Sequence, residues 1–597
     1  MVYLEKNIGS DGMQYYDYND KLAVKDQLFT PLHGVRLTGG LFRQVFDNNI
    51  RFTQRLEMDR MRYWFDIKQG REPKAARYAG HFEDNLKGQT ASQYLMCTGN
   101  VLRWEECEPL RKGMEEILDF LEEGAEPDGF LMPVDKARFA YKEYPHYVRI
   151  WLTYGLIAAA RGGSQRAFSL LRRWQDWFNH CPDLPVIKYL ELAFQGVVAS
   201  PSVYLTEIGK REDMDVTRQY YEETWRLAQF IAQERDCVNI RRQHGFEPHP
   251  HGSELEAFEG YLDLYRYSGA PYLYNAVEGC WELYKRDWQH PGGGIVMCEF
   301  SAQAHPGCNY FYKTNHYNEL CCSSFWLHLN QRLHRLFPDE EKYVFEVEQS
   351  IYNVAIANQN GDLDIRYLAL LDERKRMPVR LNHCCAGVGT RIFASLPEYL
   401  FTMTGSVLSC DLYAPCQLDW ETEEQLIRVT EETAFPYDGR VSLALDMPRA
   451  QRFTLRLRIP HYVHGPVDIL LNGQPIAQGA PGGYCVFSRL WQPGDKIEFF
   501  LDMQWRAVLY HGDNEVPGYA RYSYLYGPLL MAVVGVRNQE YGVVAPGKGE
   551  DFIRRLRPAD APLHFTVEGA PELAVAPYLE LQREEFTCFP MFADDAP

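Results

Sequence analysis

The spacing of apolar residues changes about two thirds of the way along the chain. From residue 40 to about residue 360, apolar residues recur at intervals of three and four, with breaks at Gly, Pro and Asp-Gly, and this pattern predicts helices. The clearest predicted helices lie at 110–124, 147–163, 164–180, 216–234, 253–269 and 271–288. Many helices of similar length joined by short turns indicate paired helices packed in a ring, and both a closed barrel and a solenoid fit this pattern.

After about residue 405 the apolar spacing becomes two, which is typical of strands that are buried on one face. The segments 453–460 and 495–505 alternate, and Asn472-Gly473 stands at a hairpin position within 467–477. A further β-rich segment starts at 524–536. We therefore predict an N-terminal strand segment packing on the C-terminal β region (1–25), a helical domain (26–404), an antiparallel β-sandwich domain (405–508) and a second β-rich domain (509–597).

Composition and charge narrow the range of partners. The chain of 597 residues has 46% hydrophobic and 14% aromatic residues and a formal net charge of −19, without a Lys/Arg-rich run, so nucleic acid and anionic membranes are unfavourable partners. No apolar run approaches the ~20 residues that span a bilayer. Fifteen scattered cysteines and a start without a signal sequence predict reduced thiols and a cytoplasmic location. Nucleotide-binding, serine-hydrolase and HExxH metalloprotease motifs are absent from the sequence.

Two cysteine pairs, 63 positions apart, carry the strongest candidate chemistry. Glu319, Cys321, Cys384 and Cys385 form a candidate metal set, because thiolates are favoured zinc ligands and a carboxylate can complete a tetrahedral shell. Both neighbouring cysteines can be ligands if their backbone is a loop, and the glycines of CCAGVGT favour such a loop. Buried small hydrophobic residues are the alternative interpretation. His316, His383 and Cys322 are rival ligands.

Other polar residues follow turns or precede helices. Glu299 ends the apolar stretch after the Gly-rich turn of HPGGGIVMCEF, where a carboxyl could serve as a general acid or base, although an ordinary solvated Glu is the alternative. His249, His251 and Glu254 could bind a second metal, but a loop lining a substrate cleft is the favoured interpretation. His146 precedes an apolar helix and is either a core or cap residue or a sugar contact.

The chain resembles the β-L-arabinofuranosidases of glycoside hydrolase family 127 and the related family 146. The resemblance is carried by motifs that occur in the family's order over some 500 residues. They are VRLTGGLF, DGFLMP, LYRYSG, the ELC and CC elements, RIFASLPEYLF, FPYDGRVSL, LRLRIPHYV, LLNGQPI, GYCVFSRLWQPGDKIEFFLDM and YGPLL. The family has an (α/α)6 barrel followed by β-sandwich domains, so the resemblance implies a multidomain α + β protein with a barrel as its catalytic domain.

The resemblance also implies a reaction and a set of roles. Zn²⁺ would be held by Glu319, Cys321, Cys384 and Cys385, with Cys384 also the nucleophile of a retaining exo-glycosidase and Glu299 the acid/base. The product would be a terminal β-L-arabinofuranosyl residue or a closely related sugar. Two alternatives stay open, a non-catalytic zinc-containing carbohydrate-binding protein and a lyase or epimerase on the same helical barrel.

Several departures from the family pattern surround the expected substrate cleft rather than the metal. The family's Glu-Thr-Cys reads Glu-Leu-Cys here, and Ala-Gly-Val-Gly replaces its Pro-Asn after the cysteine pair, although Arg391 is kept. These departures bear on the identity of the sugar more than on the type of reaction. We expect His146, His251 and His316 to contact the substrate, which would be an oligosaccharide or glycoside, and a homodimer is one assembly that the chain allows.

Overall fold

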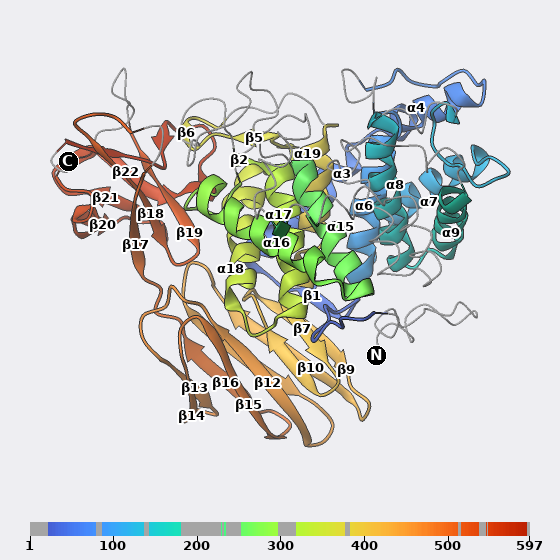
Figure 1. The fold of residues 1–597 in the computed structure, drawn as a ribbon. Helices are drawn as coiled ribbons and strands as arrows, with labels where there is room; N and C mark the ends of the chain where they lie inside the picture. The colour runs from blue at the N-terminus through green and yellow to red at the C-terminus, as the bar shows by residue number, and fades with distance from the viewer. Residues whose placement is uncertain are drawn as a thin grey trace.

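The computed structural model describes residues 22–78, 86–136, 143–180, 252–295, 318–375, 382–511, 515–535, 545 and 547–593, with residues 229, 232 and 233. Helices fill the centre and right of Figure 1, a β-sandwich lies below them, and a separate group of C-terminal strands lies on the left. The predicted segment 1–25 and the predicted helix 216–234 fall almost entirely outside the described residues. The change from helices to strands occurs near residue 400, as the apolar spacing indicates.

The helices coincide with the segments of three- and four-residue apolar spacing. The α-helices are α3 (Gly40–Gln54), α4 (Met58–Lys68), α6 (Gln89–Trp104), α7 (Glu108–Glu123), α8 (Glu143–Arg161), α9 (Gln165–His180), α15 (Gly252–Ser268), α16 (Pro271–Leu283), α17 (Leu320–Leu336), α18 (Glu341–Gln349) and α19 (Cys384–Ala394). Two π-helices, η3 (Tyr284–Trp288) and η4 (Ser350–Ile356), continue α16 and α18, and η5 (Leu396–Tyr399) is a short 3-10 helix.

Burial separates these helices into two layers. Helix α7 buries one face through Leu110, Met114, Ile117 and Leu121, which recur at three- and four-residue spacing, and it begins with a proline in its first turn. Helix α6 is instead buried along nearly its whole length. Its Gly99 permits this close packing, since a Cβ there would lie 2.2 Å from the carbonyl carbon of Ala158 in α8.

The inner helices contact one another in the order α8, α6, α19, α17 and α15. The helices that follow α6, α8, α15 and α17 in sequence pack on them from outside, namely α7, α9, α16 and α18. This arrangement agrees with the predicted paired helices. Among the helices in the described part of the chain, none combines the length and apolar character needed to cross a membrane.

Two sheets make up the β-sandwich. The first has seven strands in the order β1-β9-β10-β11-β16-β13-β14, and the second has four in the order β15-β12-β8-β7. The strands are β1 (Val35–Leu37), β7 (Phe401–Thr404), β8 (Val407–Cys410), β9 (Cys416–Glu421), β10 (Leu426–Thr433), β11 (Arg440–Asp446), β12 (Gln451–Ile459), β13 (Val467–Leu471), β14 (Gln474–Gly479), β15 (Gly483–Trp491) and β16 (Lys496–Phe500).

Pairing in the sandwich follows the sequence signals with one exception. Asn472 and Gly473 both have positive φ, 51° and 79°, and join β13 to β14 as the predicted hairpin turn. Strand β8 pairs with β12 in parallel, so the prediction of a fully antiparallel sandwich is wrong at this pair. Strand β1, which precedes the helices in sequence, pairs with β9 and extends the seven-stranded sheet.

A third sheet forms the C-terminal part of the protein. Its strands β17 (Trp505–Leu509), β18 (Ala520–Tyr526), β19 (Leu529–Val534), β22 (Ala570–Pro577), β21 (Phe565–Val567) and β20 (Leu556–Pro558) lie in that order, and β23 (Phe586–Thr587) and β24 (Met591–Phe592) pair with β19 and β18. Two 3-10 helices, η6 (Phe552–Arg555) and η7 (Tyr578–Glu580), belong to the same region.

Short strands connect this third sheet to the helices. They are β2 (Asn318–Glu319), β3 (Gln359–Asn360), β4 (Asp364–Ile365), β5 (Leu368–Ala369) and β6 (Asp372–Glu373). Strand β2 pairs with β5, and β6 pairs with β23. The segment between α18 and α19 is thereby held against the C-terminal sheet.

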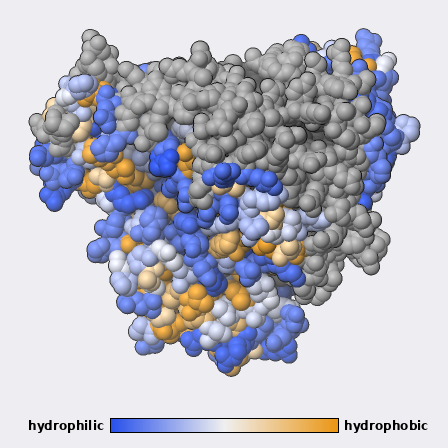
Figure 2. Space-filling view, in the orientation of Figure 1, coloured by the Kyte–Doolittle hydropathy of each residue, from blue (hydrophilic) through white to orange (hydrophobic). Residues whose placement is uncertain are grey.

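The sandwich carries part of the exposed apolar surface of the molecule. Figure 2 shows hydrophobic patches among hydrophilic ones over the lower part of the molecule, where Figure 1 places the sandwich strands. Val486, Leu490 and Phe500 are among the large apolar residues that are exposed there. Each projects from a strand whose neighbouring residues face the core, as alternation requires.

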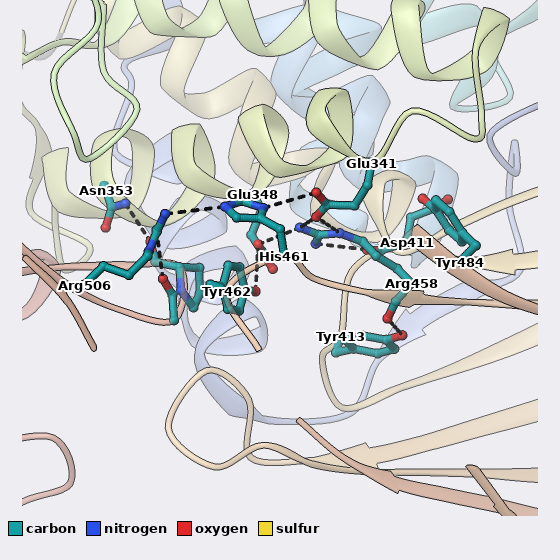
Figure 3. Close-up of polar contacts among 12 residues, drawn as sticks. Glu341, Glu348, Asn353, Asp411, Tyr413, Arg458, His461, Tyr462, Tyr484 and Arg506 are labelled. Carbon is teal, nitrogen blue, oxygen red and sulfur yellow. Dashed lines mark hydrogen bonds and ion pairs between the residues drawn. The ribbon is translucent and has the colours of Figure 1, made fainter. Parts of the chain in front are cut away.

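A buried ionic network joins the three parts of the molecule (Figure 3). The guanidinium of Arg458 on β12 is completely buried and contacts two carboxylates of α18, Glu341 at 2.6 Å and Glu348 at 3.0 Å. Burial disfavours its charge, but the two carboxylates raise the pKa of Arg458 above its usual value. Tyr462 donates a hydrogen bond to Glu348 at 2.9 Å, and His461 contacts Glu341 at 3.2 Å.

Replacing Arg458 by Met should destabilise the protein by about 3 to 5 kcal/mol, because two buried carboxylates lose their cation. Urea unfolding followed by tryptophan fluorescence measures this change. Arg557→Met is the matched control, since the ion pair of Arg557 with Glu568 is exposed and should contribute little. Equal stability of the Arg458 variant and the wild type would contradict this role of the network.

Candidate metal and active site

Three thiols from two distant segments meet at the N-terminal ends of two helices. Cys321 lies in the first turn of α17, and Cys384 and Cys385 are the first two residues of α19. Their sulfur atoms all lie within 4.8 Å of one another, with Cys321 and Cys385 separated by 3.0 Å. All three side chains are buried free thiols. The arrangement could therefore hold a metal ion.

Glu319 stands beside this thiol cluster. It ends strand β2, directly before α17, and its Oε1 lies 3.7 Å from the sulfur of Cys385. The residue is 3% exposed and pairs with Leu368 of β5. The three thiols therefore gather in one buried place, and the Glu319 carboxylate lies beside one of them, Cys385.

The backbone of the cysteine pair is helical, so the predicted loop over CCAGVGT is wrong. Both thiols can still face one point, because the first two residues of a helix project from its end about 100° apart. Gly387 and Gly389 serve close packing instead of a turn. A Cβ on Gly387 would lie 1.9 Å from Cδ of Gln93 in α6, and one on Gly389 would lie 2.8 Å from Leu320.

His383 caps α19 and is not available as a ligand. Its Nδ1 accepts a hydrogen bond from the backbone N–H of Ala386 at 3.0 Å, and its Nε2 donates to the carbonyl of Ile365 at 3.0 Å. Both ring nitrogens are therefore used in a neutral tautomer. Cys322, the other rival considered from the sequence, is fully buried in α17 and is not part of the thiol cluster.

The surroundings favour ionisation of one thiol over the other two. Burial alone raises the pKa of Cys384, but hydrogen bonds from Cys321, Cys385 and Tyr367 lower it well below its usual value. Burial raises the pKa values of Cys321 and Cys385. The position of Cys384 at a helix N-terminus adds to the effect, because the helix dipole favours a negative charge there. Cys384 is therefore the thiol of the cluster that ionises most readily.

The Gly-rich turn that precedes Glu299 in sequence packs beside β2. His290 accepts a hydrogen bond from the N–H of Gly292 at its Nδ1 (3.0 Å) and donates from Nε2 to Oδ1 of Asn318 (2.9 Å). Gly294 allows this contact, since a Cβ there would lie 2.0 Å from the Asn318 oxygen. Burial lowers the pKa of His290 to about 4, so its imidazole is neutral near pH 7.

Sequence reasoning identified the thiols and Glu319 but missed their supporting residues. Gln93, Tyr367 and Asn318 belong to no motif with a known chemical role, and no sequence signal distinguishes them. His290 could have been found, because it opens the HPGGG turn that was singled out for its glycines. The amide of Gln93 donates to the carbonyl of Cys384 at 3.4 Å.

The other predicted site residues are placed only in part. Glu299, His251 and His316 lie outside the described residues, and His146 lies in α8 but its side chain is not described. Arg391, which the family pattern keeps, lies two turns along α19 from the thiols. Its guanidinium stacks over the ring of Tyr154 at 4.2 Å and lines a polar cavity between the inner helices.

Comparisons with known proteins agree with this architecture. The family model described as "Beta-L-arabinofuranosidase, GH127 catalytic domain" matches residues 34–398, and that described as "Beta-L-arabinofuranosidase, GH127 middle domain" matches residues 407–503. The first match spans more than half of the chain and defines a glycosidase rather than a lyase, an epimerase or a binding protein. The chain belongs to glycoside hydrolase family 127, which confirms the resemblance seen in its motifs.

Solved structures of low sequence identity share the whole fold. A GH127 β-L-arabinofuranosidase from Geobacillus stearothermophilus T6 is 17% identical, with a TM-score of 0.68 over 94% of this chain and 100% of that one. A GH127 β-arabinofuranosidase is 16% identical, with a TM-score of 0.72 over 97% of this chain and 99% of that one. A third structure, described as a glycoside hydrolase, is also 16% identical, with a TM-score of 0.69 over 97% of this chain and 99% of that one. A comparison with curated proteins finds no significant match.

The glycines of α19 provide a test of the packing around the thiols. Gly387→Ala should destabilise the protein by about 1 to 3 kcal/mol, because its methyl group would overlap the buried Gln93 side chain. Truncating that side chain in the double variant with Gln93→Ala should recover part of the loss. Thermal unfolding of the two single variants and the double variant measures this coupling, and strictly additive losses would contradict it.

The buried His290 predicts a loss of stability in acid. Its pKa in the folded state lies below that of the unfolded chain, so the unfolded state takes up the proton first as the pH falls. The buried neutral His290 thereby contributes roughly 3 kcal/mol to the free energy of unfolding. This contribution is fully present above pH ~6.5 and is lost as the pH falls from ~6.5 to ~4. Urea unfolding from pH 7.5 to 4 should show a shallower decline for His290→Gln than for the wild type. His511→Gln, at an exposed position, should decline as the wild type does.

Proposed function

We propose that this protein is a retaining exo-glycosidase that releases a terminal β-L-arabinofuranosyl residue, or a closely related sugar, with Cys384 as nucleophile and Glu299 as acid/base. The observation that carries the proposal is the convergence of Cys321, Cys384, Cys385 and Glu319 within a GH127 catalytic domain. GH127 β-L-arabinofuranosidases are also among the structures that share the fold. Their substrate class is therefore the first to test.

The four donors fit a Zn²⁺ ion. Zinc bonds of ~2.3 Å to sulfur put the thiols of a tetrahedral site ~3.8 Å apart, and the observed cluster spans 3.0 Å to at most 4.8 Å. The Glu319 carboxylate, 3.7 Å from the sulfur of Cys385, would supply the fourth ligand. Buried thiols and a carboxylate at such distances would repel one another once ionised, and a divalent cation offsets that repulsion. Soft thiolate ligands favour zinc over magnesium or calcium.

The residues of the chain divide the reaction into two displacements. In the first, the Cys384 thiolate attacks the anomeric carbon while Glu299 donates its proton to the departing glycosidic oxygen. In the second, the Glu299 carboxylate removes a proton from water, whose oxygen attacks the same carbon and displaces the sulfur. Each displacement inverts the anomeric centre, so the product retains the original configuration. Bound zinc would stabilise the thiolate form of the cysteine in both steps.

Several parts of the proposal extend beyond the described residues. We propose that His146, His251 and His316 contact the sugar, and that the helices close an (α/α)6 barrel. The inner helices α8, α6, α19, α17 and α15 form a continuous series of neighbours that supports the barrel. The proposed domains are 1–25, 26–404, 405–508 and 509–597. The cytoplasmic location and the homodimer stay predictions, as does the absence of nucleic acid and membrane partners.

The decisive experiment compares variants on a panel of aryl pentofuranosides and pentopyranosides. Cys384→Ala should lower kcat/KM by at least ~10⁴-fold, because the nucleophile is lost. Cys322→Ala is the matched control, since it removes a neighbouring buried thiol outside the cluster and should keep full activity. Near-normal turnover by Cys384→Ala would rule out the cysteine nucleophile.

The same assay tests Glu299 through the dependence of turnover on the leaving group of the substrate. Glu299→Gln should lower turnover by ~10² to 10⁴-fold for alkyl glycosides, which need a proton on the leaving oxygen, and less for activated aryl glycosides. Proton NMR of the first product should show the retained anomer. Elemental analysis of the wild type should give one zinc per chain, and bound zinc without turnover of any sugar would overturn the glycosidase proposal.

A further inference from the structure

One buried amide connects the C-terminal sheet to the segment that carries Glu319. Asn353, in the π-helix η4, is completely buried, and its amide nitrogen donates to two carbonyls, Gly292 and Pro528, each at 2.9 Å. Its Oδ1 accepts the N–H of Leu530 at 2.8 Å. Both donor hydrogens and the acceptor oxygen of one side chain are therefore used by the Gly-rich turn and the β18–β19 turn of the C-terminal sheet.

The backbone of Asn353 extends this connection to strand β2. Its carbonyl accepts a hydrogen bond from the side-chain amide of Asn318 at 2.8 Å, and Asn318 immediately precedes Glu319. The carbonyl of Asn318 accepts from the amide of Asn358 at 3.3 Å. Asn318 is itself fully buried, so water does not compete for these hydrogen bonds. They fix the direction of the backbone at Glu319, the last residue of the strand.

A second set of contacts holds the partner strand of β2. Glu319 pairs with Leu368 of β5, and the hydroxyl of Tyr578 in the C-terminal region donates to the carbonyl of Leu370 at 2.9 Å. The N–H of Cys588 donates to the carbonyl of Leu371 at 2.7 Å. Residues of the C-terminal region thus hold the segment that directly follows β5, the partner strand of β2.

The turn that reaches Asn353 is the YGPLL motif, to which the proposed reaction assigns no role. Gly527 has a positive φ of 54°, and a Cβ there would lie 2.6 Å from the sulfur of Met503, so the turn requires glycine. Arg506 approaches the same turn and donates to the carbonyl of Gly527 at 3.4 Å. Figure 3 shows Asn353 and Arg506 side by side at this junction. The turn is therefore held in one position relative to η4.

We propose that Asn353 is a positioning residue through which the C-terminal sheet fixes the carboxylate of Glu319 for metal binding. Partners that orient a metal ligand affect affinity strongly, because a ligand free to rotate loses more entropy when it binds. A π-helical turn within an α-helix is often found at a functional site, and here it brings Asn353 toward three segments at once. The inference rests on the metal site proposed above.

Titration of the metal-free, full-length protein with Co²⁺ tests this role apart from catalysis. Asn353→Asp keeps the acceptor for Leu530 but loses both donor hydrogens. We expect its Co²⁺ affinity to fall by about 10- to 100-fold. The cobalt absorption bands should shift toward those of Glu319→Gln, which removes the charged ligand directly. In the Glu319→Gln background, Asn353→Asp should weaken binding no further.

Two additional variants separate positioning from a general loss of stability. Asn330→Ala removes another fully buried amide, which donates to the carbonyl of Trp326 and accepts from Trp281 at 2.8 Å each. It should lower the unfolding temperature without changing Co²⁺ affinity or spectrum. Tyr578→Phe removes one hydroxyl from the second set of contacts and should weaken Co²⁺ binding severalfold in a folded protein.

The outcomes are distinguishable. Wild-type affinity and spectrum in Asn353→Asp would overturn the positioning role while leaving the metal site intact. Equal losses of affinity in Asn353→Asp and Asn330→Ala would also overturn it, since stability alone would then explain the effect. No Co²⁺ binding by the wild type would overturn the proposed metal site and this inference together.

Discussion

The contact between the sandwich and the helices centres on the pairing of one completely buried cation. Arg458 comes from the sandwich, while its two carboxylates, Glu341 and Glu348, come from a single helix of the catalytic domain. An unpaired charge in such an interior costs several kcal/mol, so the sandwich is stable only where both carboxylates reach the guanidinium. Tyr462 and His461 add one hydrogen bond to each of these carboxylates. The orientation of the sandwich is therefore set by charge pairing as well as by apolar contact.

Helix α18 connects this ionic network to the proposed catalytic centre. The helix continues without interruption into the π-helix η4, which contains Asn353 and contacts both the Gly-rich turn and strand β2. The carboxylate ligand, the ionic network and the C-terminal turn thus share one rigid element. The relative positions of the sandwich, the third sheet and the thiol cluster all depend on this single helix, although it contributes no ligand to the proposed metal site.

The sequence predicted those features whose signals are local. Helix α7 and the Asn472-Gly473 turn follow from apolar spacing and from the φ angles that a tight hairpin requires. The meeting of Cys321, Cys384 and Cys385 could be predicted, because thiols in such pairs are typical metal ligands. The helical backbone of α19 could not, since Gly387 is explained by the distant side chain of Gln93 and not by a turn. Asn353 likewise gives no signal, because its partners lie about 60 and 175 residues away in sequence.

The separation of these partners has a consequence for biosynthesis. Pro528, Leu530 and Tyr578 emerge from the ribosome long after Cys321 and Cys384, yet they complete the surroundings of strand β2. Local helices can form on the nascent chain, whereas contacts of such long range must wait for the last strands to be synthesised. The thiols are therefore translated early, whereas the hydrogen bonds that hold η4 and the segment after β5, next to strand β2, can form only at the end of synthesis.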